Sequence, residues 1–234
     1  MKPATEMKIE VMDTAEAVAQ RAAVIIAEET RLAVNIRGRF VIAVSGGRTP
    51  WLMLRELAGT DVPWQAVHIV QVDERVAPSG DPDRNLRHLR ESLGPAPISA
   101  GQIHQMTVES ADLEAAATAY AKTLQQVAGV PPVLDLVHLG IGPDGHTASL
   151  VPDDPVLTIE DADVAVTGVY QGRRRMTLTY PIINRSRRVL WVVTGREKTL
   201  ALRRLLDGDA SIPAGRVRRQ NALVIADHDA AEEL

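Results

Sequence analysis

Three short stretches of the sequence carry side chains that can do acid–base or anion chemistry. His146 follows the glycines of HLGIGPDGHTASLVP, and an imidazole with an unperturbed pKa of about 6.5 suits proton transfer near neutrality. Asp73 and Arg75 stand in the triplet DER, which places carboxylates beside a guanidinium. In SGGRTP (45–50), glycines let the backbone approach a phosphate or carboxylate closely. Taken singly, each stretch also has an ordinary structural interpretation. His146 is typical of a solvated histidine, DER of a salt bridge in a loop, and SGGRTP of a capped turn between a strand and a helix.

The glycines before His146 allow two interpretations. From Gly140 they match G-x-G-x-x-G, the dinucleotide fingerprint, which requires a strand before it and a substantial helix after it. Pro152 leaves room for little more than about two helical turns, and Asp144 puts negative charge where a pyrophosphate would bind. We therefore predict a catalytic loop and no dinucleotide cofactor, with Asp144 orienting the imidazole or binding a sugar hydroxyl.

The elements that must position these loops alternate between strands and helices. Apolar runs predict strands at 40–44, 66–72, 103–106, 134–139, 164–170, 175–180, 189–195 and 222–226. Helical periodicity predicts helices at 13–36, 49–57, 85–93, 111–127 and 197–206. A capping box at Asp13 and a glycine at Gly38 mark the ends of the first helix. This pattern predicts an α/β fold with a mostly parallel, doubly wound, Rossmann-like sheet and helices on both faces, in one domain over residues 1–234.

Four loops that carry chemistry follow predicted strands, at Ser45, Asp73, Gly140 and Thr194. In open parallel sheets, ligands bind beyond the carboxyl ends of the strands, where such loops converge. The sequence therefore predicts one shared site.

The composition argues against several classes of function. A formal net charge of -4 and 3% aromatic residues disfavour a nucleic-acid surface, which needs a basic field and stacking rings. No apolar run approaches the roughly 20 residues that span a bilayer, and MKPATEMKIE lacks a signal-peptide pattern, so we expect a cytoplasmic protein without a membrane partner. The absence of cysteine removes thiolate nucleophiles and thiolate metal ligands. Clustered arginines at 173–175 and 187–188 still allow a pocket for one small anion.

Six segments taken together resemble the 6-phosphogluconolactonase family. They are SGGRTP, VDERVAP, DRNLRHL, LGIGPDGHTASLVP, RMTLTYPIIN and VTGREK, in order over nearly the whole chain, and DGHTAS is the most specific. The resemblance implies hydrolysis of 6-phospho-D-glucono-1,5-lactone to 6-phosphogluconate without a metal or organic cofactor. It also implies a fold shared with glucosamine-6-phosphate deaminases. We expect the partner to be this small sugar phosphate, and the protein to be a monomer or a weak homodimer.

The resemblance also implies roles for individual residues. His146 would be the general base, and Arg75 would stabilise the developing oxyanion, with backbone N–H groups of 142–145 as helpers. Asp73 or Asp144 would orient Arg75, His146 or sugar hydroxyls, and the sequence does not divide this role between them. The candidate catalytic residues are thus His146, Arg75, Asp73 and Asp144.

The phosphate is expected against the turn from Ser45 to Thr49, with Arg175 and Lys198 as cationic arms. Arg173 and Arg174 are alternatives to these arms, and Asn85 is expected to hold the acidic loop together by side-chain hydrogen bonds. The candidate binding residues are Ser45, Gly46, Gly47, Arg48, Thr49, Gly142, Gly145, Arg175 and Lys198.

Two other classes of function predict different sequence features. A sugar-phosphate deaminase would carry a glutamate shortly after the DGH triplet, whereas no carboxylate follows His146 before Asp153. A non-catalytic sugar-phosphate sensor would carry a helix-turn-helix, for which we expect no room before the first helix. The combination of Asp73, Arg75 and His146 also favours catalysis. Val76 departs from the family, which often has an aromatic residue there.

Overall fold

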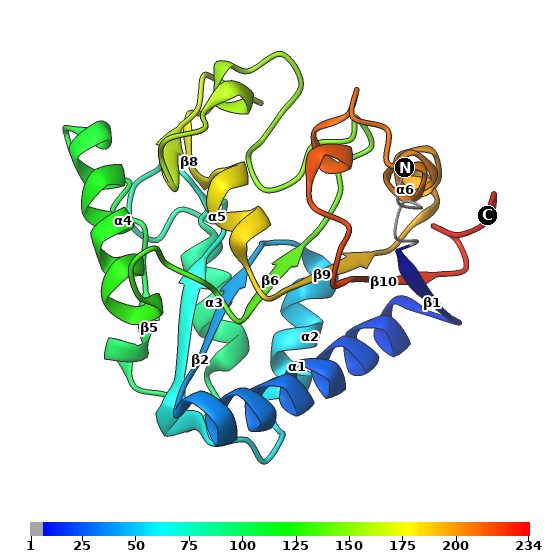
Figure 1. Ribbon diagram of the computed structural model, residues 1–234, viewed down its shortest axis with the longest axis horizontal. Coiled ribbons are helices and arrows are strands. Elements are labelled where there is room, and N and C mark those ends of the chain that lie inside the picture. Colours follow the sequence, from blue (N-terminus) through cyan, green and yellow to red (C-terminus); the bar gives the residue numbers. More distant parts are fainter. Residues whose placement is uncertain (1–6) are drawn as a thin grey trace.

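The computed structural model describes residues 7–234; residues 1–6, part of the start that lacks a signal-peptide pattern, lie outside the described range. The strands are β1 (Lys8–Met12), β2 (Phe40–Val44), β3 (Val67–Gln71), β4 (Asp73–Arg75), β5 (Ile103–His104), β6 (Leu136–Leu139), β7 (Val164–Val166), β8 (Arg175–Leu178), β9 (Arg188–Val193) and β10 (Ala222–Asp227). Seven of them form a central sheet in the order β1-β10-β9-β6-β2-β3-β5, with every neighbouring pair parallel (Figure 1). The other three form a small antiparallel sheet in the order β4-β8-β7.

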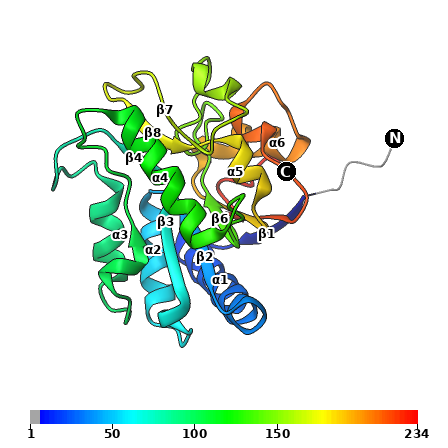
Figure 2. The same cartoon turned by 60° about the vertical axis from the view of Figure 1, so that its left-hand side comes forward.

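Helices cover both faces of the central sheet. They are α1 (Ala15–Arg37), α2 (Arg48–Ala58), α3 (Asn85–Leu93), α4 (Leu113–Ala128), α5 (Tyr180–Arg185) and α6 (Thr199–Asp207). The first three lie on one face, and α4, α5, α6 and the small sheet lie on the other (Figure 2). Strand β2 shows why: Phe40 and Ile42 point into the core beneath α1–α3, and Val41 and Ala43 into the opposite core. The predicted α/β architecture is therefore confirmed. No helix within residues 7–234 is long and apolar enough to cross a membrane.

The structure corrects several details of the predicted elements. Strand β1 was not predicted, because it is an edge strand with no continuous apolar run, and the short helix α5 was missed as well. The first helix begins at Ala15, with Thr14 as its N-cap in place of Asp13: the Thr14 hydroxyl accepts from the N–H of Ala17. The segments predicted as strands at 164–170 and 175–180 shorten to β7 and β8.

The acidic triplet was expected in a loop and instead forms strand β4. The chain leaves the central sheet after β3 and pairs antiparallel with β8, so that Asp73 lies opposite Thr177 and Arg75 opposite Arg175. This pairing depends on a segment about a hundred residues away, which local sequence patterns do not reveal.

His138 sits fully buried in β6 and connects this strand to the end of β2. Its Nδ1 accepts from the backbone N–H of Ser45 at 3.3 Å, and the Ser45 hydroxyl donates to the His138 carbonyl at 3.0 Å. A backbone N–H can only donate, so Nδ1 is unprotonated and the ring proton lies on Nε2. Burial lowers the pKa of His138 to about 3, and the ring is neutral at any pH near 7.

This buried imidazole should make the fold sensitive to acid. The unfolded chain takes up a proton below about pH 6.5 and the folded chain does not until about pH 3, so stability is lost as the pH falls. Between pH 7.5 and 5.0 the free energy of unfolding, measured in urea, should fall by about 2 kcal/mol more for the wild type than for His138→Asn. Equal losses in both proteins would contradict this origin.

Candidate active site

A cavity of about 560 Å³ lies where the loops after β2, β3, β6 and β9 meet. The convergence predicted for these loops is therefore present, at the carboxyl ends of the parallel strands. Its lining includes eleven of the thirteen candidate residues: Ser45, Gly46, Gly47, Arg48, Thr49, Asp73, Arg75, Gly142, His146, Arg175 and Lys198. The other two, Asp144 and Gly145, lie outside the lining.

Asp144 stands behind His146 and holds its imidazole. The Asp144 Oδ1 lies 2.6 Å from the His146 Nδ1 and also accepts the His146 backbone N–H at 3.1 Å. Burial by itself would raise the pKa of Asp144, but the hydrogen bonds from His146 and from the Tyr170 hydroxyl lower it below its ordinary value. An ionised carboxylate only accepts, so Nδ1 carries the ring proton and the lone pair of Nε2 is left free to take another.

The tight turn before His146 depends on Gly142. A Cβ at this position would overlap the imidazole of His146, so only glycine lets the ring fold back over the turn. The N–H of Gly142 donates to the His146 carbonyl at 2.8 Å, and that of Gly145 donates to the Gly142 carbonyl at 2.9 Å. These two N–H groups therefore already donate within the turn, and the expected assistance of an oxyanion by the N–H groups of 142–145 stays a prediction. Gly145 also contacts the segment before β10, since its carbonyl accepts from the N–H of Ala214 at 2.9 Å and a Cβ there would overlap Ile212.

The turn after β2 presents the N-terminus of α2 to the cavity. Gly47 is the N-cap, with a backbone φ of 137° that residues other than glycine rarely adopt. A glycine offers no side chain to cap the helix. The N–H groups of Arg48 and Thr49 belong to the first turn and have no intrahelical acceptor. This turn contains no acidic residue, so the positive end of the helix dipole favours an anion there.

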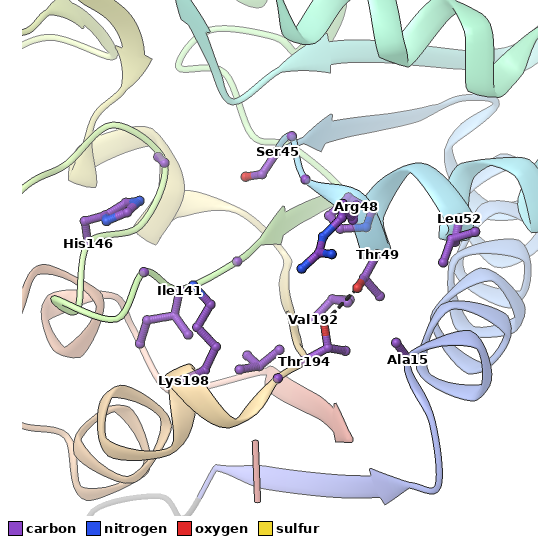
Figure 3. Close-up of a pocket in the computed structure, with 18 of the residues that line it drawn as sticks. Ala15, Ser45, Arg48, Thr49, Leu52, Ile141, His146, Val192, Thr194 and Lys198 are labelled. Atoms are coloured by element: carbon purple, nitrogen blue, oxygen red, sulfur yellow. Dashed lines mark hydrogen bonds between the residues drawn. The ribbon is translucent and has the colours of Figure 1, made fainter. Parts of the chain in front are cut away.

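Two cationic side chains reach the same space. Arg48 extends into the cavity from α2 and Lys198 from the loop after β9, between His146 at one end and Leu52 at the other (Figure 3). Burial lowers the pKa of the Lys198 amine. The carboxylates of Glu197 and Asp144 oppose this shift, and the positive charge of Arg48 adds to it. Close by, the hydroxyls of Thr49 and Thr194 lie 2.7 Å apart and join the loops after β2 and β9.

A second pair of cations lies on the small sheet. Arg75 in β4 is directly opposite Arg175 in β8, an arrangement of like charges that destabilises a sheet unless an anion or carboxylate compensates. Arg175 is 5% exposed, and its pKa is lowered by burial and then modulated by Asp73, which raises it, and Arg75, which lowers it. Arg175 therefore lies beside Arg75, although we expected from the sequence that it would bind the phosphate together with Lys198. Of the alternative arms, Arg173 pairs with Asp81 at 3.1 Å, and neither Arg173 nor Arg174 lines the cavity.

Asn85 joins Asp73 and Arg75 of β4 by side-chain hydrogen bonds, as predicted for the acidic segment. Its amide donates to the carbonyl of Asp73 at 3.0 Å and to the Asp73 carboxylate at 3.3 Å, and its oxygen accepts from Arg75 at 2.9 Å. The other carboxylate oxygen of Asp73 accepts from Ser149 at 2.6 Å. Asp73 therefore orients the Asn85–Arg75 side of the cavity, and Asp144 orients His146.

Two residues that the sequence analysis did not single out support the site. Glu74 is fully buried and binds the N-terminus of α3, where the N–H groups of Asn85 and Leu86 donate to it at 2.8 and 2.9 Å. Tyr170 donates to the Oδ2 of Asp144 at 3.1 Å. Within residues 7–234, no group of three His, Asp or Glu side chains is placed to hold a metal ion.

The fold and cavity define an α/β protein with a site for a small anionic ligand, equipped with an acid–base pair. The chain belongs to the family described as glucosamine-6-phosphate isomerases/6-phosphogluconolactonase, whose model matches residues 13–225.

Curated relatives and solved structures agree with this membership. The 6-phosphogluconolactonase of Synechocystis sp. is 36% identical over 97% of this chain and 98% of its own. That of Mycobacterium tuberculosis is 39% identical over 86% of this chain and 88% of its own. The crystal structure of 6-phosphogluconolactonase from Thermotoga maritima has a TM-score of 0.83 at 27% identity, covering 94% of this chain and 98% of that one. A monomeric glucosamine-6-phosphate deaminase reaches a TM-score of 0.83 at 21% identity, which shows a shared fold alone.

Substitution of Glu74 tests whether its buried carboxylate stabilises the fold around the site. Glu74→Gln should lower the free energy of unfolding by about 3 kcal/mol, because it removes the buried charge that pairs with Arg84 and accepts the N–H groups of Asn85 and Leu86. The control is Glu109→Gln, which removes a half-exposed partner of the same Arg84 and should change stability by less than about 1 kcal/mol. Urea denaturation of both variants measures the difference, and equal effects would contradict the assignment.

Proposed function

We propose that the protein hydrolyses 6-phospho-D-glucono-1,5-lactone to 6-phospho-D-gluconate, with His146 as the general base. Membership of the family and the printed names of the relatives support the reaction. The observation that carries the mechanism is the contact of 2.6 Å between Asp144 and the Nδ1 of His146, which leaves Nε2 as the basic nitrogen beside the cavity.

The reaction begins with attack of water on the lactone carbonyl carbon. The Nε2 of His146 takes a proton from the water as its oxygen bonds to carbon, and the carbonyl oxygen becomes negatively charged. Collapse of this tetrahedral intermediate breaks the bond between the carbonyl carbon and the ring oxygen, which receives the proton from His146. The new carboxylic acid then releases its own proton to solvent, so one proton appears for each lactone opened.

Charge on the intermediate is balanced by the cations of the small sheet. Arg75 and Arg175 are held side by side before any substrate arrives, so an oxyanion between them meets charge that needs no reorganisation. The guanidinium of Arg75 is fixed by a hydrogen bond that its Nη1 donates to the Oδ1 of Asn85. We assign Arg175 to this end of the cavity because it lies directly opposite Arg75 in the small sheet and lines the same cavity.

The phosphate of the substrate binds at the other group of cations. The first turn of α2 supplies the N–H groups of Arg48 and Thr49, and the side chains of Arg48 and Lys198 supply positive charge. Ser45, Gly46 and Gly47 form the wall against which the phosphate lies. Binding energy from this remote group orients the lactone toward His146.

Lactone hydrolysis is favoured over deamination by the residues after His146. The positions from Thr147 to Val151 contain no carboxylate, and Ser149 is committed to Asp73. Hydrolysis needs one base and an oxyanion stabiliser, whereas an aldose–ketose rearrangement needs a further group that shuttles protons. We include in this proposal a single domain, a cytoplasmic location, no nucleic-acid partner, and a monomer or weak homodimer.

The proposed function is tested by proton release from freshly generated lactone, compared with spontaneous hydrolysis. The wild type should accelerate release strongly, and His146→Ala should lower kcat by at least roughly a hundredfold, the scale of a general base. Circular dichroism should show that the variant is folded. No acceleration by the folded wild type would exclude lactone hydrolysis, and full activity of the variant would exclude His146 as the base.

The phosphate site is tested by the pH dependence of product binding. The pKa of Lys198 is lowered by burial, so its charge is lost at a lower pH than that of an exposed lysine, and a rising pH should weaken 6-phosphogluconate binding. Calorimetry from pH 7 to pH 10 should show a growing dissociation constant for the wild type and a flatter profile for Lys198→Arg, which keeps its charge. Identical profiles would remove Lys198 from the phosphate site.

A further inference from the structure

Tyr170 connects the acid–base pair with the cations of the small sheet. Its hydroxyl donates to the Oδ2 of Asp144 at 3.1 Å, while the other oxygen of that carboxylate binds His146. The pKa of Tyr170 is raised by burial and by the negative charge of Asp144, so the hydroxyl keeps its proton and remains a donor. Both oxygens of the carboxylate therefore have a fixed hydrogen-bond partner.

The ring of Tyr170 makes two further contacts. Its edge meets the imidazole of His146, with ring centroids 5.5 Å apart and planes at 63°. The guanidinium of Arg175 lies over its face, 4.9 Å from the centroid, within the range of a cation–π interaction. One side chain thus touches Asp144, His146 and Arg175.

The backbone holds Tyr170 at the tip of the β7–β8 hairpin. Tyr170 and Arg173 exchange N–H to carbonyl hydrogen bonds at 3.0 and 3.2 Å around a two-residue turn. Gln171 and Gly172 both have positive φ, 50° and 79°, as a type I′ turn requires.

The positive φ of Gln171 is energetically unfavourable for a residue other than Asn or Gly, but its side chain makes hydrogen bonds that compensate. The Gln171 oxygen accepts from Arg175 at 3.1 Å, and its amide lies 3.4 Å from the Tyr170 hydroxyl. The turn therefore fixes the relative positions of Tyr170 and Arg175.

We propose that Tyr170 is a positioning residue that aligns the base and the oxyanion-binding cation with each other. Its hydroxyl sets the orientation of Asp144, and through it the tautomer of His146, while its ring sets the position of the Arg175 guanidinium. This inference rests on the proposed function for its effect on turnover. A purely structural role would change stability and leave the balance between kcat and KM as it is.

Two variants separate the hydroxyl from the ring. Tyr170→Phe should lower kcat roughly tenfold with KM changed less than about twofold, because one hydrogen bond to a charged group is lost and the ring stays. Tyr170→Leu should lower kcat at least as much and also raise KM, because Arg175 loses the ring face. Val169→Ala is the matched control: this neighbour is 71% exposed and should behave as the wild type. A Tyr170→Phe variant with wild-type kcat would overturn the proposal.

The protonation of the His146 ring can be measured by NMR without any turnover of substrate, so it tests the role of Tyr170 independently of the proposed function. In the neutral imidazole, the ¹⁵N chemical shifts of His146 report which nitrogen carries the proton. Tyr170→Phe should increase the fraction with the proton on Nε2, whether or not the lactone is the substrate, and Val169→Ala should not. An unchanged tautomer in Tyr170→Phe would overturn the role of the hydroxyl. Failure of the wild type to hydrolyse the lactone would instead contradict the proposed function.

Discussion

The buried carboxylate of Glu74 holds together the part of the site that does not belong to the central sheet. It accepts hydrogen bonds from Gln71, from the backbone of Arg75 and from the first turn of α3, and pairs with Arg84 at 3.2 Å. A fully buried charge is tolerated only when its hydrogen bonds are satisfied. Because Glu74 and its neighbours alternate along β4, fixing Glu74 in the core directs Asp73 and Arg75 toward the cavity.

The site is thus built from two rigid parts with different origins. The parallel strands bring the N-terminus of α2 and the loop of His146 to one edge of the sheet, and the small sheet brings Arg75 and Arg175 above them. Four cationic side chains line one cavity, and burial lowers the pKa values of two of them, Arg175 and Lys198. The positive charges of Arg75 and Arg48 add to these two shifts. The fold holds these like charges close together, and in the proposed function an anionic substrate would compensate them, so that substrate binding and charge stabilisation would come from the same arrangement.

The sequence was sufficient for those features that depend on local pattern. The run FVIAV coincides with β2 because a strand covered on both faces is continuously apolar, and the glycines before His146 signalled the tight turn. The sequence was not sufficient for features that depend on contacts between segments far apart in the chain. The strand character of β4 and the inward direction of Glu74 require the pairing with β8, and the turn at Gln171 gave no local sign that Tyr170 would reach Asp144. The role left open between the two aspartates likewise needed the contacts of each in three dimensions.

The central claim is that Asp144 keeps the ring proton of His146 on Nδ1 and leaves Nε2 free as the base. The most direct measurement is the ¹⁵N NMR spectrum of the neutral imidazole in histidine-labelled wild-type protein, with His146→Gln used to assign the signals. We expect a protonated Nδ1 and an unprotonated Nε2 for His146. A proton on Nε2 would contradict it, because that nitrogen could then accept no proton from the attacking water.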